Sequence, residues 1–393
     1  MIKTEYYKDL TKMNTFGMKV KARCFIEYDS VADLVDIEFE ELARPVLHIG
    51  GGSNLLFTDD FKGTVLHSKI DFIEILDESQ CAPVSSCHCE ELASCHCEER
   101  SDVTISSPVL VSVGAGVVFD DFCAWAAKEG LWGVENLSYI PGEVGASAVQ
   151  NIGAYGVEVK DVIRRVYCYD TVEEEFVNFS VEECEYGYRD SIFKDPEVKG
   201  RYIVTHVVFA LSREPKPVLD YGHLKDAFSS HCQFDCNEKS LTPSLIRKTI
   251  IKIRKEKLPE PSVKGSAGSF FKNPVVPMEH YLRIEAAAKA EFGPDYKVPH
   301  YIIETEPSSC HPERSEGSVP GSLVKIPAAW MIEQCGWKGK RSGGAAVWDK
   351  QPLVIVNHTG EAYPEEIIGL EKRIIASVKA KFGVELHPEV EHI

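Results

Sequence analysis

Glycine spacing gives the first chemical clue, in the stretch from Ile140 to Gly156, which reads I-P-G-E-V-G-A-S-A-V-Q-N-I-G-A-Y-G. Because each glycine gives up side-chain packing, we expect neither a regular helix nor a strand here. With few side chains in the way, backbone N–H groups can approach a flat or anionic ligand closely. The pattern favours a binding loop; a surface loop rich in turn residues is the alternative.

A second glycine stretch, Gly50-Gly51-Gly52-Ser53-Asn54, lies between the apolar runs V-L-H-I and L-L-F. A strand, a glycine turn and a second strand in this order can wrap a pyrophosphate with main-chain N–H groups. The stretch lacks the G-x-G-x-x-G spacing and the following helix of a Rossmann fingerprint. A plain hairpin turn between the two strands is the alternative.

A short Cys-His repeat occurs three times, as S-S-C-H-C-E-E at 85–91, A-S-C-H-C-E-E at 93–99 and S-S-C-H-P-E-R at 308–314. By residue type, Cys87, His88 and Cys89 and their counterparts in the second copy could bind zinc. The C-x-C pairs nevertheless match no common structural zinc spacing, and the third copy keeps only one Cys and one His. We therefore expect two solvated, largely disordered insertions at 78–106 and 304–320, and no metal.

The elements that must position these stretches can be read from the apolar pattern. Strands are expected at 20–28, 46–49, 109–113, 162–169 and 202–211. Helices are expected near 30–34, from an Asp120 cap to Lys128, from Pro243 to the basic turn that ends at Lys257, at 328–334, and over 367–382. A glycine turn is expected at 341–347.

Composition narrows the class of protein. The chain has 393 residues, enough for two or three domains, with 44% hydrophobic and 26% charged residues, as in ordinary globular proteins. Its formal charge of −18 argues against nucleic acid as a partner. No apolar run reaches the length of a membrane span, and the charged start is unlike a signal peptide, so we expect a cytoplasmic protein. The thirteen cysteines do not indicate a disulfide framework.

Taken together, the motifs resemble the UDP-N-acetylenolpyruvoylglucosamine reductase family, flavoproteins of bacterial cell-wall precursor synthesis. The resemblance rests on H-I-G-G-G-S-N-L-L-F, the 140–156 stretch, Y-G-Y-R-D-S-I-F-K, G-S-A-G-S-F-F-K-N-P, the A-A-W-M-I-E-Q-C-G and S-G-G-A-A-V block, and the terminal P-E-V, in family order. It covers nearly the whole chain outside the two insertions. It implies an α+β fold: an FAD-binding fold of the vanillyl-alcohol-oxidase type in two subdomains, 1–70 and 71–220, and a substrate-binding domain, 221–393.

The resemblance also implies the ligands and their residues. FAD and NADPH are the implied cofactors, a UDP-sugar is the implied substrate, and the protein is expected to be a monomer. The FAD-binding residues are Gly50, Gly51, Gly52, Ser53, Asn54, Ile140, Pro141, Gly142, Gly145, Ala146, Ser147, Gln150, Asn151, Gly153, Ala154 and Tyr155. The substrate-binding residues are Tyr188, Tyr221, Lys257, Asn273 and Gln334, with Tyr221 matching the aromatic of the first of the family's two types.

Three residues take the catalytic positions of the family. Reduction of an enolpyruvyl ether requires a hydride at the terminal carbon and a proton at the carbon that bears the carboxylate. Ser269 matches the proton donor, and Glu389 matches the C-terminal carboxylate that assists protonation. Arg189 can bind the substrate carboxylate and stabilise the developing enolate with its planar donors. The simpler alternatives are a capping serine, a surface Arg189–Asp190 pair and a solvated tail glutamate.

Three features depart from the family. The insertion around 304–320 separates V-P-H-Y at 298–301 from V-K-I-P-A-A-W, and two residues differ. Glu143 replaces a commoner small residue, which brings a negative charge near a phosphate-bearing cofactor unless it points away, and Ser266 replaces a commoner Asn. Two other classes of protein also compete with the reductase. One is a flavin-dependent alcohol oxidase of the same cofactor fold, and the other is a metal- or redox-responsive protein built around the Cys-His repeats.

Overall fold

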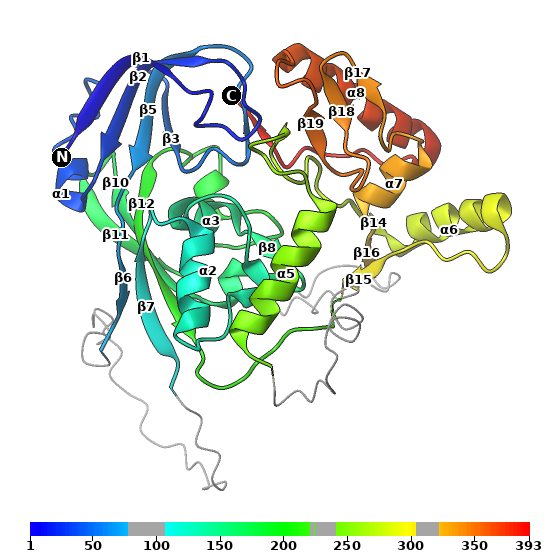
Figure 1. The fold of residues 1–393 in the computed structure, drawn as a ribbon, viewed down its shortest axis with the longest axis horizontal. Coiled ribbons are helices and arrows are strands. Elements are labelled where there is room, and N and C mark those ends of the chain that lie inside the picture. Colours follow the sequence, from blue (N-terminus) through cyan, green and yellow to red (C-terminus); the bar gives the residue numbers. More distant parts are fainter. Residues whose placement is uncertain (78–106, 221–223, 225–240, 304–321) are drawn as a thin grey trace, which may run out of the picture. The chain divides into compact units, whose positions relative to one another are not determined.

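The computed structural model of the chain describes residues 1–77, 107–220, 224, 241–303 and 322–393. The chain folds as two compact units, each assembled from separate segments (Figure 1). The first unit comprises Met1–Glu5, Cys24–Gly51 and Gly63–Arg254; the second comprises Tyr6–Arg23, Gly52–Lys62 and Lys255–Ile393. Both units mix helices and strands, in agreement with the α+β class expected from the sequence.

The first unit contains a five-stranded antiparallel sheet in the order β11-β10-β12-β7-β6. Its strands are β6 (Ile73–Ile75), β7 (Val109–Gly114), β10 (Ile163–Asp170), β11 (Glu175–Ser180) and β12 (Tyr202–Leu211). The strands predicted at 109–113, 162–169 and 202–211 are confirmed, because their runs of β-branched residues are long enough to be read alone. The edge strands β6 and β11 were not predicted, since no residue of either strand is fully buried.

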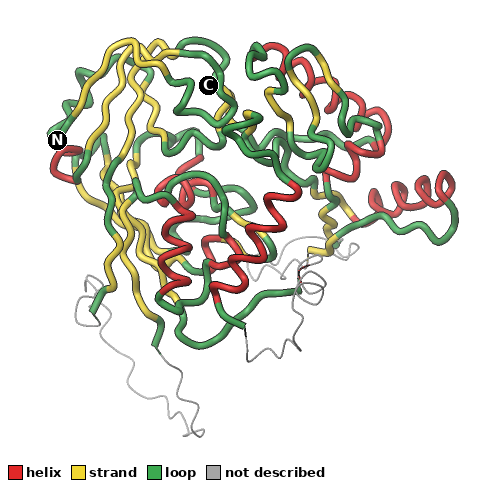
Figure 2. The backbone as a smooth tube through the Cα atoms, viewed as in Figure 1, coloured by secondary structure: helices red, strands yellow, loops and turns green. Residues whose placement is uncertain are grey.

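Helices α2 (Phe119–Lys128) and α3 (Val144–Gln150) pack near this sheet (Figure 2). The Phe122 ring of α2 lies 4.6 Å from that of Phe209 on β12, centroid to centroid. The predicted end of α2 at Lys128 is confirmed, but the predicted Asp120 cap is wrong: Val118 is the N-cap residue and makes no side-chain cap. The Asp120 carboxylate instead accepts hydrogen bonds from Arg247 and from the backbone N–H of Tyr139.

The glycine stretch at 140–156 corrects our expectation that it would hold no helix or strand. It contains the whole of α3 and the short strand β8 (Gly153–Ala154), which pairs with β9 (Val157–Glu158). A Cβ added at Gly145 would lie 2.9 Å from the Cβ of Ala115. This glycine therefore lets a helix approach its neighbour closely, which local propensity does not reveal. Among the described residues of this unit, short 3-10 turns lie at Glu135–Leu137, Val159–Asp161 and Ile192–Lys194.

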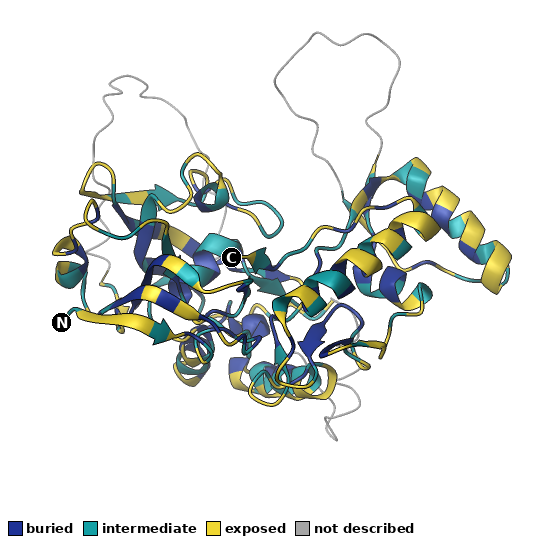
Figure 3. Ribbon diagram, turned by 90° about the horizontal axis from the view of Figure 1, so that it is seen from above, coloured by how far each residue is buried: buried dark blue, intermediate teal, exposed yellow. Residues whose placement is uncertain are grey.

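A four-stranded sheet has the order β1-β2-β5-β3. Its strands are β1 (Lys3–Asp9), β2 (Lys21–Tyr28), β5 (Phe61–Ser68) and β3 (Val46–Ile49). Strand β1 is exposed along nearly all its length (Figure 3). Because β3 pairs in parallel with β5, and β4 (Leu55–Leu56) pairs with β20 (Glu391–His392), the glycine turn at 50–54 is not a hairpin.

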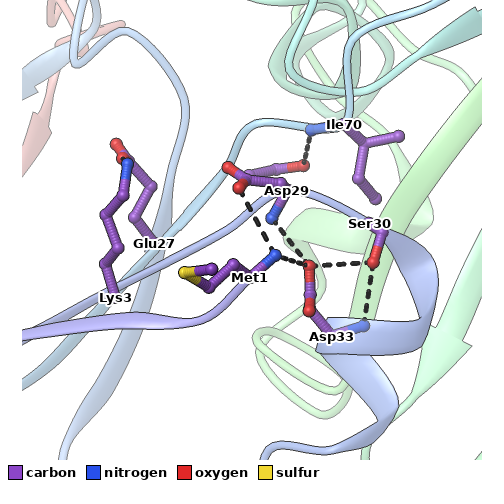
Figure 4. Close-up of polar contacts among 8 residues, drawn as sticks. Met1, Lys3, Glu27, Asp29, Ser30, Asp33 and Ile70 are labelled. Carbon is purple, nitrogen blue, oxygen red and sulfur yellow. Dashed lines mark hydrogen bonds and ion pairs between the residues drawn. The ribbon is translucent and has the colours of Figure 1, made fainter.

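The predicted helix near 30–34 is α1 (Val31–Val35), and its first turn is well capped. The Ser30 hydroxyl accepts a hydrogen bond of 3.1 Å from the N–H of Asp33 and donates one of 2.8 Å to the Asp33 carboxylate (Figure 4). A serine at the N-cap satisfies an otherwise unpaired helix N–H. The local sequence was therefore sufficient to place this helix.

The second unit is built from short strands and helices of 7 to 19 residues. Its sheets have the orders β13-β19-β18-β17 and β14-β16-β15. The strands are β13 (Gly265–Ser266), β14 (Val275–Pro277), β15 (Tyr301–Ile303), β16 (Leu323–Lys325), β17 (Arg341–Ser342), β18 (Ala345–Val347) and β19 (Ile355–Asn357). The helices are α6 (Met278–Phe292), α7 (Ala328–Gln334) and α8 (Pro364–Phe382). The glycine turn predicted at 341–347 is the hairpin between β17 and β18.

Three helix predictions in the C-terminal half are confirmed, at α7, α8 and α5 (Pro243–Lys257). Helix α8 buries Ile367, Leu370, Ile374 and Val378 along one stripe, as its periodicity indicated. Helix α6 was not predicted; it buries Tyr281, Ile284 and Ala288. Across the described part of the chain, no helix has the length and apolar character needed to span a membrane.

Candidate functional site

In the first unit, Gly50 and Gly51 lie against the beginning of the 140–156 stretch. A Cβ at Gly51 would lie 3.5 Å from the Cα of Gly142, and one at Gly50 would lie 3.1 Å from the Cβ of Ala146. Gly142 has a φ of +125°, which a side chain would disfavour. The two predicted cofactor segments are thus adjacent here, and their glycines add no side chains of their own, which fits a ligand held by main-chain N–H groups.

Tyr139, Asp120 and Arg254 hold the entry to the 140–156 stretch. None of the three was assigned to the cofactor site from the sequence. Tyr139 has a φ of +62°; its N–H donates to Asp120, and its carbonyl accepts a 3.1 Å hydrogen bond from Arg254 Nε. Burial lowers the pKa of Arg254, and the neighbouring Tyr155 opposes that effect. The sequence signal was the basic last turn of α5, but only the fold shows that Arg254 faces this loop while Lys257 is exposed.

The exit of the stretch is bound to the Y-G-Y-R-D-S segment. Arg189 donates from Nη1 to the carbonyl of Asn151 at 3.1 Å and from Nη2 to the carbonyl of Gly153. The Asn151 amide donates to the carbonyl of Gly187 at 2.7 Å, and Lys194 Nζ donates to Gln150 Oε1 at 3.1 Å. The predicted catalytic arginine is therefore fixed on the predicted cofactor loop, with a strained φ of +56°.

The other residues of this group occupy α3, its flanks or the arginine segment. Ser147 is buried and its hydroxyl donates to the carbonyl of Val144. Tyr188 lies beside Arg189, with the guanidinium carbon 5.4 Å from the ring centroid. Pro141 is exposed, while Ile140, Ala154 and Tyr155 are partly exposed.

In the second unit, the rest of the glycine stretch at 50–54 contacts the N-T-F-G turn at 14–17. Gly52 has a φ of +59°, and a Cβ there would lie 1.9 Å from the carbonyl oxygen of Met13. The carbonyl of Gly52 accepts from the N–H of Thr15 at 3.1 Å, and the Thr15 carbonyl accepts from the N–H of Ser266 at 2.9 Å. Through Thr15, which we did not select from the sequence, the backbone of Ser53 and its neighbours is tied to the G-S-A-G-S motif.

The C-terminal tail returns to Ser269. The N–H of Glu389 donates to the carbonyl of Phe270 at 2.8 Å, and the N–H of Lys272 donates to the carbonyl of His387 at 2.9 Å. The Asn54 amide donates to the carbonyl of Glu389 at 3.0 Å, and β20 continues alongside β4. Three predicted residues far apart in sequence, Asn54, Ser269 and Glu389, are thus neighbours along the backbone. Glu389 is half-buried, so it does not belong to a freely solvated tail.

The predicted substrate residues of this unit are Lys257 at the end of α5, Gln334 at the end of α7, and Asn273, which lies just before β14. Asn273 Oδ1 accepts a 2.9 Å hydrogen bond from the first N–H of α7, the helix that ends at Gln334. Gln334 lines a cavity of about 290 Å³ between α6, α7 and α8, beside Trp330 and Phe382. Lys257 is exposed, and its carbonyl accepts from the Trp348 indole at 3.0 Å.

Some predictions fall on residues that the structure does not describe. Tyr221, the Cys-His repeats and both expected insertions lie outside the described residues. Within the described ranges, no three His, Cys, Asp or Glu side chains are grouped so as to hold a metal ion. Cys24, Cys123, Cys168, Cys184 and Cys335 are not in disulfide bonds.

Two domain families match the sequence. Residues 260–393 match the C-terminal domain of UDP-N-acetylenolpyruvoylglucosamine reductase. Residues 103–178 match an FAD binding domain, and this range includes the 140–156 stretch.

Full-length relatives match both parts at once. The UDP-N-acetylenolpyruvoylglucosamine reductase of Bacteroides fragilis is 46% identical over 98% of each chain. The reductase of Porphyromonas gingivalis is 39% identical over 98% of this chain and 97% of its own. The solved reductase of Thermus caldophilus has the same fold, with a TM-score of 0.58 and 20% identity over 100% of this chain and 98% of its own. The expected fold class, an FAD-binding fold followed by an α+β C-terminal domain, is confirmed.

Proposed function

The chain belongs to the UDP-N-acetylenolpyruvoylglucosamine reductase family, and we propose that its glycine-rich segments hold FAD while Ser269, Glu389 and Arg189 serve the reduction. The enzyme is a UDP-N-acetylmuramate dehydrogenase. It catalyses the NADPH-dependent, FAD-mediated reduction of UDP-N-acetyl-3-O-(1-carboxyvinyl)-glucosamine to UDP-N-acetylmuramate, in peptidoglycan precursor synthesis. The alternatives, another FAD-dependent oxidoreductase or a metal-responsive protein, are not favoured.

The proposed cofactor site uses main-chain groups. Gly50, Gly51 and Gly142 have no side chains, and we propose that their N–H groups bind phosphate oxygens. When bound, FAD accepts hydride from NADPH and delivers it to the terminal carbon of the enolpyruvyl group. The protein then has to orient the substrate, stabilise the negative charge that develops and supply a proton.

We assign these tasks to three side chains. Arg189 binds the substrate carboxylate and stabilises the enolate, because its planar guanidinium offers parallel charged donors. Ser269 delivers the proton to the carbon beside the carboxylate; a serine is a poor acid, so its hydroxyl needs polarising neighbours. Glu389 assists that protonation. Tyr188, Tyr221, Lys257, Asn273 and Gln334 are proposed to bind the UDP-sugar.

One observation supports this assignment above the others. The backbone hydrogen bond from Glu389 to Phe270 brings the C-terminal tail beside Ser269, although 120 positions separate them in the sequence (389 − 269). A capping serine and a solvated tail would need no such pairing. The same tail is held by Asn54, which we assign to the cofactor.

The test is to replace Ser269 and follow the two half-reactions separately by stopped-flow flavin absorbance. If the proton is given only as hydride is transferred, the hydroxyl contributes chiefly in the transition state. Ser269→Ala should therefore bind FAD, be reduced by NADPH and bind the UDP-sugar normally. Reoxidation by the enolpyruvyl substrate should slow by at least ~10²-fold, the lower range for losing a positioned proton donor.

Two further variants sharpen the result. Ser269→Cys should recover part of the rate, because a thiol is a better acid though larger. Ser262→Ala, which changes another exposed serine of the same unit, should leave both half-reactions unchanged. If Ser269→Ala slows flavin reduction and spares reoxidation, the serine is not the proton donor.

The proposal also covers the oligomeric state, the cellular location and the domain limits of the enzyme. We propose a monomeric, cytoplasmic enzyme with cofactor subdomains at 1–70 and 71–220 and a substrate domain at 221–393. Sedimentation equilibrium of the FAD-loaded protein would test the oligomeric state. Limited proteolysis with and without the UDP-sugar would test the domain limits.

A further inference from the structure

We propose that His67 is a positioning residue for the cofactor loop, and that its imidazolium balances the Glu143 carboxylate that lies against Gly50. The inference rests on the proposed FAD site, because Gly50, Gly51 and Gly142 belong to it. Its new content is that a buried charge cluster within the first unit sets how FAD affinity depends on pH.

The geometry places His67 between two carboxylates. Its Nε2 lies 3.0 Å from Glu143 Oε1, and its Nδ1 lies 3.2 Å from Glu27 Oε2. Only 4% of His67 is exposed. In the parallel pairing of β3 with β5, His67 is opposite Ile49, the residue before Gly50. Carboxylates therefore hold the imidazole from both sides. It belongs to β5 and lies beside the end of β3, the strand that leads into the glycine turn.

Glu143 joins the two glycine segments. Its Oε2 lies 3.3 Å from the point where a Gly50 Cβ would be, while its Oε1 faces His67. Glu143 is also the N-cap residue of α3 and accepts the first backbone hydrogen bond of that helix, from Ser147. The carboxylate that departs from the family pattern is therefore turned into the protein and bound by an imidazole.

The charges alternate along the cluster. Lys3 Nζ lies 3.5 Å from Glu27 Oε1 (Figure 4), so Glu27 has a cationic neighbour besides His67. Lys3 is largely exposed, and solvent screens that pair. The Glu143 pair is buried and is screened far less. The protonation state of His67 therefore decides whether a positive charge balances the negative charge of Glu143.

The surroundings favour the protonated form of His67. Burial lowers its pKa, but the hydrogen bond and charge of Glu143 and the hydrogen bond of Glu27 outweigh burial and the repulsion from Lys69, so the pKa is raised. The nearby His48, hydrogen-bonded to the Tyr28 hydroxyl at 2.7 Å, is held neutral: burial and then the charge of His67 lower its pKa to about 4. Of the two imidazoles, His67 is therefore the one whose surroundings favour the charged form.

The direction of the pH effect follows from these signs. A histidine whose pKa is raised in the folded protein loses its charge as the pH rises through that pKa. Glu143 is then an unbalanced carboxylate beside backbone that we assign to the FAD pyrophosphate. Because like charges repel strongly where solvent is excluded, FAD should bind more weakly in alkaline solution.

The experiment measures the FAD dissociation constant of the full-length apoprotein by quenching of flavin fluorescence, from about pH 6 to about pH 9, around and above the usual histidine pKa of about 6.5. The wild-type protein should lose affinity by about tenfold or more, the equivalent of one pKa unit. Glu143→Gln keeps the shape and removes the charge, so its profile should be flat. His67→Gln should bind as weakly at about pH 6 as the wild type does at about pH 9.

A matched control and a fold check accompany these variants. Asp170 is another buried carboxylate of the first unit, bound to Arg201 and to backbone N–H groups of Val172 and Glu173, with its pKa lowered overall. Asp170→Asn should keep the wild-type profile. Thermal unfolding of each apoprotein shows whether it is folded, and if His67→Gln is not, Glu143→Gln alone decides.

The outcomes distinguish failure of the His67 proposal from failure of the proposed cofactor site. If the wild type binds FAD and Glu143→Gln keeps the same pH slope, the role of His67 is refuted while the cofactor site stands. The same conclusion follows if the wild-type affinity does not change with pH. If the wild-type apoprotein binds no FAD at any pH, the proposed cofactor site is refuted, and this inference falls with it.

Discussion

Replacing Gly145 by alanine tests whether close packing of α3, rather than loop flexibility, explains a glycine in the cofactor stretch. Gly145 is the second residue of the helix, where alanine alone would be worth up to about 1 kcal/mol of added stability. A Cβ there would, however, lie 2.9 Å from Ala115 Cβ and 3.4 Å from the Ala115 carbonyl oxygen. The two effects have opposite signs, so the structure has to decide between them.

The packing effect should win, because Ala115 has little freedom to move. It is buried, its N–H donates to the carbonyl of Thr205 at 2.9 Å, and its carbonyl accepts from the N–H of Gly145 at 3.0 Å. Overpacking at such a site costs about 1 to 3 kcal/mol, and stretching the hydrogen bond adds about 1 kcal/mol. After subtracting the helix propensity of up to about 1 kcal/mol, we expect a net loss of about 1 to 3 kcal/mol.

The assay is thermal unfolding followed by circular dichroism, with and without saturating FAD. For a unit of this size, the loss corresponds to a midpoint lowered by roughly 2 to 12 °C. The matched control is Gly369→Ala in α8, where nothing lies within 4 Å of the added Cβ, so stability should rise by about 0.5 to 1 kcal/mol. A Gly145→Ala protein at least as stable as the wild type would refute the packing argument.

Two further predictions concern the cofactor and the insertions. Gly153→Val should leave the protein folded but without FAD, because its Cβ would lie 2.7 Å from Arg189 Nη1 and displace that side chain from the loop; stoichiometric flavin in the purified variant would contradict this. Deletion of residues 80–104 or 306–319 should preserve folding and flavin content, since these polar repeats have little apolar surface to bury; loss of folding, or stoichiometric zinc in the intact protein, would count against it.

The sequence alone determined the elements whose information is local. The strand at 202–211 and the helices at 243–257 and 328–334 were predicted with their observed limits, because their apolar periodicity and flanking residues specify them. The helix expected near 30–34 forms, and Ser30 caps its first turn. The motifs in family order were sufficient for the fold class and the activity, although no single glycine turn would have been.

The tertiary structure decided what depends on partners distant in the sequence. Asp120 is not a helix cap because Arg247, 127 positions away, binds its carboxylate. Glu143, whose carboxylate could have faced a cofactor phosphate, is bound by His67, 76 positions away. Helix α3 forms in a glycine-rich stretch because Ala115 leaves room for its backbone and accepts its N–H. Local propensity differs by about 1 kcal/mol or less per residue, so packing and buried hydrogen bonds of comparable or larger energy override it wherever the fold supplies them.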